Sequence, residues 1–153
     1  MNLDQLLPPS ATLICDQITS KKKMLEKISE VMAQTIETSE KKIFDSLICR
    51  EKLGTTALGD GVAIPHGRLA ACQNPTAVFI LLETPIDYDA PDGKPVDIVF
   101  AILVPKEAHD EHLHHLAQIA KILSDEELVL KLRHAHSDGV LYELLEHATE
   151  QFS

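Results

Sequence analysis

The segment 59–68, with the sequence GDGVAIPHGR, gives His66 the most constrained setting of any histidine in this chain. Pro65 fixes its own φ and biases Ile64 toward an extended conformation, while Gly67 permits a close backbone approach. A neutral imidazole is nucleophilic near neutral pH, and a glycine-flanked segment can present backbone N–H groups to an anion. His66 is therefore either an exposed residue at the junction of a strand and a turn, or a side chain aimed at an anionic group. The local sequence leaves both readings open.

A predicted helix over 109–124 holds four of the eight histidines, in the run HDEHLHH. His112 falls at the edge of its apolar face, where a helix borders a cleft. His114 and His115 point away from that face into solvent, and His109 belongs to the first turn. We therefore predict that His112 is the one histidine of this helix that faces a site. With a step of about 100° per residue, the residues sharing the apolar face are Leu113, Leu116, Ala117, Ala120 and Leu123.

A metal site is the alternative for this helix, because His109, His112 and His115 recur at a spacing of three residues. The sequence has no H-E-x-x-H motif and the histidine cluster brings no cysteine, and these are the usual signs of a zinc site. Adventitious metal binding stays open, whereas we expect no structural or catalytic metal and no cofactor. The remaining histidines, which occupy polar positions in C-terminal helices and need no function, are His134, His136 and His147.

Arg50 ends a predicted helix four residues before Gly54. A cation at the C-terminus of a helix is favoured by the helix dipole, and this alone explains an arginine there. The planar guanidinium also suits contact with a phosphoryl group. Arg50 is thus a candidate anion-binding residue that also has a simple structural explanation.

Apolar periodicity indicates the elements that must position these residues. Ser20, Ser39 and Ser137 are predicted helix caps, and a capping box at Ser124 and Glu127 is predicted to start another helix. Asp92-Gly93 indicates a chain reversal. The predicted strands are 11–16, 76–83 and 96–104, with short extended pieces in 54–68, and the predicted helices are 20–36, 39–51, 109–124, 125–134 and 138–148. Helices at both ends with strands between them predict an α/β fold in three layers, a sheet covered by helices on both faces.

Composition excludes several classes of function. With 153 residues we expect one domain spanning 1–153, and the formal net charge of −10 argues against a nucleic-acid surface. The sequence carries no signal-peptide pattern and no apolar run long enough to span a membrane. Three widely spaced cysteines suggest neither a disulfide framework nor a zinc ribbon, so we expect a reducing, cytoplasmic environment.

Four stretches of the chain together resemble one protein family. The motif G-[VI]-A-I-P-H-G, present at 61–67, marks the phosphorylated histidine in the enzyme IIA domains of the bacterial phosphoenolpyruvate phosphotransferase system, mannitol/fructose class. The run SKKKMLEKIS and the compact length favour the nitrogen-regulatory branch of this family over sugar transport. The stretches are SKKKMLEKIS (20–29), REKLGTTALGDGVAIPHGR (50–68), ETPIDYDAPDGKPVDIVFAILVP (83–105) and HLHHLAQIAKILSD (112–125).

The resemblance implies a mixed central sheet with helices on both faces. It also implies that His66 accepts a phosphoryl group from a small histidine-phosphorylated carrier protein. His112 matches the second active-site histidine of the class, and Arg50 matches its arginine. The chain departs from the family at Ala57, where we expect glycine, and at Asp60, where we expect a neutral residue although aspartate is tolerated.

Three functions remain open from the sequence. The first is a phosphoacceptor whose phosphorylated and unphosphorylated forms bind different regulatory partners, which the resemblance implies include potassium-transport and sensor-kinase components. The second is a fructose- or mannitol-specific enzyme IIA that passes the phosphoryl group to a IIB domain. The third is a metal- or pH-sensing binding module without phosphorylation. For the first two, we predict that partners dock on a small apolar patch around His66, formed by Leu58, Val62 and Leu69.

Overall fold

The computed structural model describes residues 3–107 and 110–151, without the side chains of residue 4 and residues 110–113. Within these residues, six strands form one mixed sheet in the order β1-β5-β6-β3-β2, and β4 also pairs with β6. The β5–β6 and β2–β3 pairs are antiparallel, whereas β1–β5, β3–β6 and β4–β6 are parallel. The strands are β1 (Thr12–Cys15), β2 (Ala57–Gly59), β3 (Val62–Ala63), β4 (His66–Leu69), β5 (Thr76–Ile86) and β6 (Val96–Pro105).

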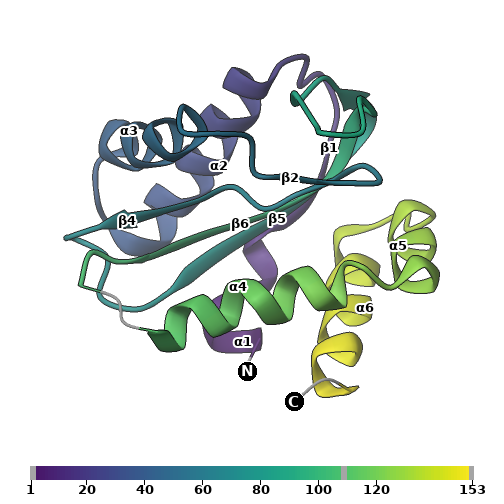
Figure 1. Ribbon diagram of the computed structural model, residues 1–153. Helices are drawn as coiled ribbons and strands as arrows, with labels where there is room; N and C mark the ends of the chain where they lie inside the picture. Colours follow the sequence, from purple (N-terminus) through teal and green to yellow (C-terminus); the bar gives the residue numbers. More distant parts are fainter. Residues whose placement is uncertain (1–2, 108–109, 152–153) are drawn as a thin grey trace.

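Helices cover both faces of this sheet, with α2 and α3 on one side and α4 on the other (Figure 1). The predicted α/β class, with a mixed central sheet between helices, is therefore confirmed. A short 3-10 helix, η1 (Pro9–Ala11), precedes β1. The α-helices are α1 (Leu3–Leu6), α2 (Lys21–Ile36), α3 (Glu40–Glu51), α4 (Asp110–Ile122), α5 (Glu126–Arg133) and α6 (Asp138–Gln151).

The central strands β5 and β6 form the middle of the hydrophobic core. Both read as near-continuous apolar runs in the sequence because both of their faces are covered, as the burial of residues 77–82 and 98–104 shows. Phe79 pairs with Phe100 in the antiparallel register, and their rings pack edge to face with centroids 6.1 Å apart. This rigid pair of strands is the platform on which β3 and β4 are aligned.

Three of the predicted helix caps are confirmed. The Ser20 hydroxyl accepts a hydrogen bond from the backbone N–H of Lys23, and Ser39 accepts one from Lys42. Ser137 caps the last helix by accepting from the N–H of residue 140. Each serine thus satisfies a backbone donor that the first helical turn leaves without a partner.

The capping box at Ser124 and Glu127 is wrong. Asp125 caps α5 instead, because its carboxylate accepts from the N–H groups of Glu127 and Leu128. The Ser124 hydroxyl points back along the chain and donates to the Lys121 carbonyl at 2.6 Å, at the end of α4. The helix thus begins one residue later than we predicted, and a carboxylate that accepts two N–H groups replaces the serine as its cap.

The segment 54–68 forms the three short strands β2, β3 and β4, as its extended pattern predicts, and His66 is the first residue of β4. Pro65 has no N–H to give, and its carbonyl accepts from the N–H of Ile102 at 2.9 Å. The parallel ladder with β6 then starts at the pair His66 and Ile102. His66 therefore sits where the chain joins the edge of the rigid platform.

All three cysteines lie among the described residues. Cys15, Cys49 and Cys72 are all free thiols. In the described part of the chain, no helix has both the length and the apolar character needed to cross a membrane.

Candidate functional site

The His66 imidazole is half-buried, and one of its nitrogens is already engaged. Its Nδ1 lies 2.9 Å from the carbonyl oxygen of Ile64. A carbonyl oxygen only accepts hydrogen bonds, so Nδ1 carries the proton in the neutral ring and Nε2 holds the lone pair. The ring is thus oriented with Nε2 as its nucleophilic atom.

The segment that carries His66 is fixed at both ends by backbone hydrogen bonds. The N–H of Ile64 donates to the carbonyl of Thr56 at 3.1 Å, which joins the segment to the loop after α3. Pro65 is tied to β6 through the N–H of Ile102. These two contacts hold the Pro-His pair on a sheet edge, which is why its imidazole has a defined direction.

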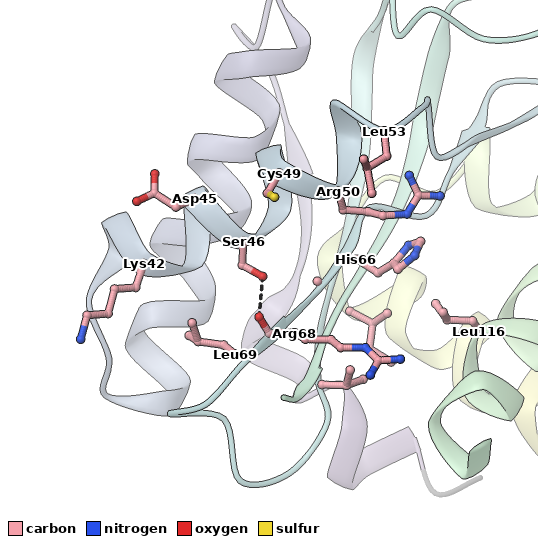
Figure 2. Close-up of a pocket in the computed structure, with 13 residues that line it drawn as sticks. Lys42, Asp45, Ser46, Cys49, Arg50, Leu53, His66, Arg68, Leu69 and Leu116 are labelled. Atoms are coloured by element: carbon pink, nitrogen blue, oxygen red, sulfur yellow. Dashed lines mark hydrogen bonds between the residues drawn. The ribbon is translucent and has the colours of Figure 1, made fainter. Parts of the chain in front are cut away.

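Helix α3 packs against β4 at its closest point through Gly67. A Cβ atom at this position would clash with the Ser46 hydroxyl and lie 3.2 Å from the Ser46 backbone carbon, so a side chain here would push Ser46 and α3 away from β4. The Ser46 hydroxyl also donates to the Arg68 carbonyl at 2.7 Å. This close approach places the C-terminal turn of α3 beside His66, as Figure 2 shows.

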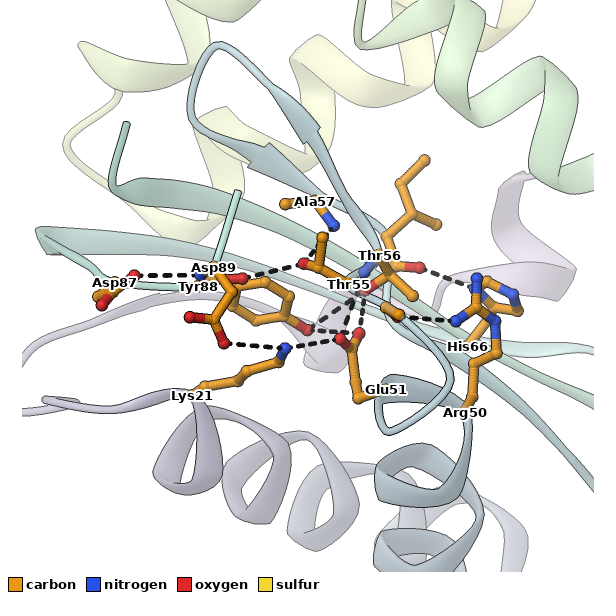
Figure 3. A network of polar contacts seen from close by, with 12 residues as sticks. Lys21, Arg50, Glu51, Thr55, Thr56, Ala57, His66, Asp87, Tyr88 and Asp89 are labelled. Atoms are coloured by element: carbon orange, nitrogen blue, oxygen red, sulfur yellow. Dashed lines mark hydrogen bonds and ion pairs between the residues drawn. The ribbon is translucent and has the colours of Figure 1, made fainter. Parts of the chain in front are cut away.

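Arg50, in the last turn of α3, faces the same space as His66 (Figures 2 and 3). Its Nη1 donates to the carbonyl of Gly54 at 2.9 Å, so the loop after α3 orients the guanidinium. Gly54 adopts φ +152°, a conformation that favours glycine over residues with a side chain. Arg50 keeps further N–H groups beyond this contact, because a guanidinium carries five.

Burial lowers the pKa of His66 below the usual 6.5, since it disfavours the imidazolium. The hydrogen bond to Ile64 opposes this effect, and the charges of Arg50 and Arg68 add to the lowering while Glu51 raises the pKa. His66 is therefore neutral at neutral pH, which is the nucleophilic form.

Two cavities flank His66 and Arg50. The larger, of about 720 Å³, extends along α3 and has the cations Lys42 and Arg68 at its rim. The smaller, of about 320 Å³, lies between the loop after α3 and helix α4. The larger cavity is lined by Lys42, Asp45, Ser46, Cys49, Arg50, Leu53, His66, Gly67, Arg68, Leu69, Ile102, Val104 and Leu116. The smaller is lined by Arg50, Thr55, Thr56, Ala57, Leu58, Ile64, His66, Leu116, Ala117 and Ala120.

Helix α4 reaches this site through Leu116, which lines both cavities and which we predicted on the packed apolar face. Residue 112 lies on α4 one helical turn before Leu116, and the side chain of His112 lies outside the described residues. The structure thus brings His66 and Arg50 together and places the backbone of α4 beside them. The role of His112 stays a prediction.

The predicted apolar face of α4 is partly wrong. Ala117 is exposed, and among the described side chains of α4 the most buried are Ile119 and Ile122, so the packed face is rotated from the predicted one. His115 lies one turn before Ile119 on the packed side and is half-buried, whereas we expected it in solvent. His114 is exposed, as predicted.

The predicted docking patch is wrong at one position and incomplete at another. Val62 is only 3 % exposed because it belongs to the sheet, whereas Leu58 is 52 % exposed and Leu69 is half-buried at the rim of the larger cavity. Leu53, which we did not predict, is 83 % exposed and lines the larger cavity. Its exposure could have been predicted from its place between Lys52 and Gly54, just past the end of a helix.

A metal site finds no support in the described part of the chain. Among residues 3–107 and 110–151 with described side chains, no group of three or more His, Cys, Asp or Glu could hold a metal ion. His109 and the side chain of His112 lie outside these residues, so the histidine spacing of α4 stays untested.

Comparison with known proteins agrees on one family. Residues 5–148 match the family described as "Phosphoenolpyruvate-dependent sugar phosphotransferase system, EIIA 2". A nitrogen regulatory protein of Pseudomonas aeruginosa is 42 % identical over 146 residues, which cover 95 % of each chain.

Two solved structures show the same architecture. The crystal structure of nitrogen regulatory protein IIA-Ntr from Neisseria meningitidis superposes with a TM-score of 0.87 at 38 % identity, covering 94 % of this chain and 98 % of that one. Enzyme IIA for mannitol from Escherichia coli, solved in complex with phosphorylated enzyme IIB, superposes with a TM-score of 0.74 at 20 % identity, covering 92 % of this chain and 98 % of that one. This second likeness concerns the fold alone.

Proposed function

Because this chain belongs to the EIIA 2 family of the phosphoenolpyruvate-dependent sugar phosphotransferase system, we propose that it carries a phosphoryl group on His66. The observation that carries the proposal is the hydrogen bond between Nδ1 of His66 and the Ile64 carbonyl, which leaves Nε2 as the lone-pair nitrogen beside Arg50. We infer that Nε2 is the atom that accepts the phosphoryl group.

The reaction is an in-line displacement at phosphorus. Nε2 of His66 forms a bond to the phosphorus of a phosphohistidine on the donor, and the donor's N–P bond breaks. The donor imidazole leaves with the bonding electron pair and takes up a proton from water, so a neutral ring is released, while the His66 ring, which keeps its Nδ1 proton, becomes a phosphorylated imidazolium. In this transfer the charge spreads over the equatorial oxygens, and Arg50 supplies N–H donors to them without a metal.

His112 is the second proposed active-site residue. Helix α4 presents Leu116 to both cavities, and residue 112 precedes it by one turn on that helix. We propose that the His112 imidazole donates a hydrogen bond to the phosphoryl oxygens. We expect His112→Ala to slow the transfer to His66 without abolishing it, in contrast to His66→Ala.

We place the protein in the nitrogen-regulatory branch, as one enzyme IIA domain acting in the cytoplasm. Its identity to nitrogen regulatory proteins, 42 % and 38 % in the two comparisons above, exceeds its 20 % identity to the mannitol enzyme IIA. The phosphoryl donor would be a small histidine-phosphorylated carrier. Because the added phosphoryl group brings nearly two negative charges, the two forms would present different surfaces to regulatory partners, among them proteins of potassium transport.

The second candidate is a sugar-specific enzyme IIA that hands the phosphoryl group to a IIB domain. The mannitol enzyme IIA, which shares this fold, was solved with phosphorylated enzyme IIB. Incubating the phosphorylated chain with fructose- and mannitol-type IIB domains separates the two candidates. Rapid transfer to a IIB domain favours the sugar branch, and its absence favours the regulatory branch.

Incubation with enzyme I, a histidine-containing carrier and phosphoenolpyruvate, followed by mass spectrometry of the intact chain, tests the proposal. We expect one acid-labile, base-stable phosphoryl group on the wild type and none on His66→Ala. The matched control is His114→Ala, which removes an exposed histidine of α4 and should label like the wild type. Labelling of His66→Ala at the wild-type level would reject His66 as the acceptor.

A further inference from the structure

Glu51 directly follows Arg50, a residue of the proposed phosphoryl site, and its carboxylate is buried. Its side chain is 2 % exposed, whereas the side chain of Arg50 points the other way, toward His66 (Figure 3). A carboxylate is rarely buried so fully unless it is paired. Its partners therefore indicate what this charge does.

Three separate segments meet at the Glu51 carboxylate. Lys21, from the first turn of α2, places its Nζ 2.9 Å from Oε2, and the Tyr88 hydroxyl donates to Oε1 at 3.0 Å. The backbone N–H of Thr56 donates at 3.3 Å and the Thr56 hydroxyl also donates. Lys21 lies in addition over the Tyr88 ring, 4.6 Å from its centroid, which is a cation–π contact.

These contacts close the loop that orients Arg50. Glu51 begins the loop and its carboxylate binds Thr56 at the far end, so the chain between them is held as a tight arch. Gly54 lies within that arch, and its carbonyl accepts the hydrogen bond from Nη1 of Arg50. The position of the guanidinium therefore depends on the arch that Glu51 closes.

A second route leads from the same arch to the imidazole. The carbonyl of Thr56 accepts from the N–H of Ile64, whose own carbonyl accepts from Nδ1 of His66. Thr55 ties the arch to the segment before β6, since its hydroxyl donates to the Tyr88 carbonyl at 2.9 Å. Both groups that would act on the phosphoryl group thus rest on one loop.

Stability alone does not account for a charge at this place. The desolvation of a buried ion pair offsets much of its attraction, and packed apolar residues often stabilise a fold as well or better. An apolar cluster has no donors and acceptors that would hold a loop in one conformation. The four polar contacts on the Glu51 carboxylate do so.

We propose that Glu51 is a positioning residue for phosphoryl transfer, which fixes the 51–56 loop and through the Gly54 carbonyl holds the Arg50 guanidinium toward Nε2 of His66. This inference rests on the proposed function of His66. It assigns to Glu51 a role in the rate of the chemical step, without contact with the phosphoryl group.

The test is a double-substitution cycle on the rate of transfer from phosphorylated carrier, measured by rapid quench. Glu51→Gln keeps the shape and removes the charge, and we expect it to slow transfer roughly 10- to 100-fold, with the carrier concentration at half-maximal rate nearly unchanged. In an Arg50→Gln background the same substitution should cost less, because one of the two groups that rest on the loop is already gone. An equal loss in both backgrounds, or no loss in either, would overturn the proposal.

Tyr88→Phe provides a milder second variant, since it removes one hydrogen bond to Glu51 and keeps the ring under Lys21. If Glu51→Gln fails to fold, Tyr88→Phe takes its place in the double-substitution cycle with Arg50→Gln. Asp97→Asn is the matched control, because Asp97 pairs with Arg133 at 2.9 Å on α5, away from the arch. We expect it to lower stability and leave the transfer rate at the wild-type level.

The outcomes separate this inference from the proposed function. If the wild type is not phosphorylated at all, the assignment of His66 fails. If the wild type is phosphorylated and both Glu51→Gln and Tyr88→Phe transfer at the wild-type rate, the assignment of His66 stands and the role of Glu51 is rejected.

Discussion

Nδ1 of His66 lies 2.9 Å from the carbonyl oxygen of Ile64, two residues earlier in the chain. A backbone carbonyl, with no second side chain, thus fixes the neutral tautomer and the orientation of the ring. Pro65, between the two residues, stiffens the connection because its φ is restricted. The backbone therefore determines which ring nitrogen is nucleophilic. Substitutions of nearby side chains should change the rate of transfer and leave the phosphorylated nitrogen the same.

Arg50→Gln tests the guanidinium. We expect the rate of phosphoryl transfer to fall roughly 100- to 1,000-fold, because a preorganised donor to the developing charge is lost. Arg50→Lys should recover part of this loss, since it restores the charge without the planar fork. Lys52→Gln, which removes an exposed cation two residues later, is the control and should leave the rate unchanged. A wild-type rate for Arg50→Gln would contradict the role of Arg50.

The pH dependence follows from the lowered pKa of His66, which results mainly from burial. The rate of transfer should fall on acidification with a midpoint below the ordinary histidine pKa of about 6.5. Stopped-flow or rapid-quench rates as a function of pH measure it. An acid limb centred above about 6.5 would show that the imidazole is more easily protonated than its burial indicates.

The same shift has a consequence for stability. In the unfolded chain His66 takes up a proton below about pH 6.5, whereas in the folded chain it does so only at lower pH. The free energy of unfolding is therefore highest above that pH and falls as the pH decreases below it. Urea unfolding of the wild type and His66→Gln at about pH 8 and pH 5.5 measures the difference. We expect the wild type to lose more unfolding free energy on acidification than the variant does. An equal loss would contradict the shift.

Gly67→Ala tests the close packing of α3 on β4. The added methyl group would clash with the Ser46 hydroxyl and meet the Ser46 backbone, so we expect the free energy of unfolding to fall by about 1–3 kcal/mol. Adding Ser46→Ala should recover only part, because the contact with the backbone carbon at 3.2 Å remains. Chemical denaturation measures both variants. Full recovery in the double variant would show that the hydroxyl alone sets the spacing.

Leu53→Asp tests the apolar rim of the larger cavity as a docking surface. Leu53 is 83 % exposed, so its replacement should leave the free energy of unfolding nearly unchanged. We expect the carrier concentration at half-maximal transfer rate to rise, because an acidic chain depends on apolar contacts or on a basic partner for docking. Val140→Asp, an exposed apolar residue on α6, is the matched control. Equal effects of the two substitutions would remove Leu53 from the docking surface.

Much of the fold could be predicted because it depends on local patterns. Continuous apolar runs predict β5 and β6, and serine caps predict the starts of α2, α3 and α6, all of which the structure contains. The start of α5 could not be placed correctly, because Ser124 and Asp125 both suit a cap and only the end of α4 decides between them. The rotation of α4 likewise depends on how it packs, which a pattern of apolar residues defines only coarsely.

The candidate site was predictable to the extent that its residues carry a motif. His66 stands in a short specific pattern, and Arg50 precedes it in the same stretch of chain. Glu51, Lys21 and Tyr88 were missed because they meet only in space: Lys21 lies 30 positions before Glu51 and Tyr88 lies 37 positions after it. Nothing in the local sequence distinguishes a buried glutamate from an exposed one at the end of a helix.

The central claim is that Nε2 of His66 carries the phosphoryl group while Nδ1 keeps its proton on the Ile64 carbonyl. Long-range proton–nitrogen correlation spectra of the ring, recorded on nitrogen-labelled protein before and after phosphorylation, test it most directly. We expect a protonated Nδ1 in both states, with coupling to phosphorus at Nε2 after transfer. A phosphoryl group on Nδ1, or on any residue other than His66, would contradict the account.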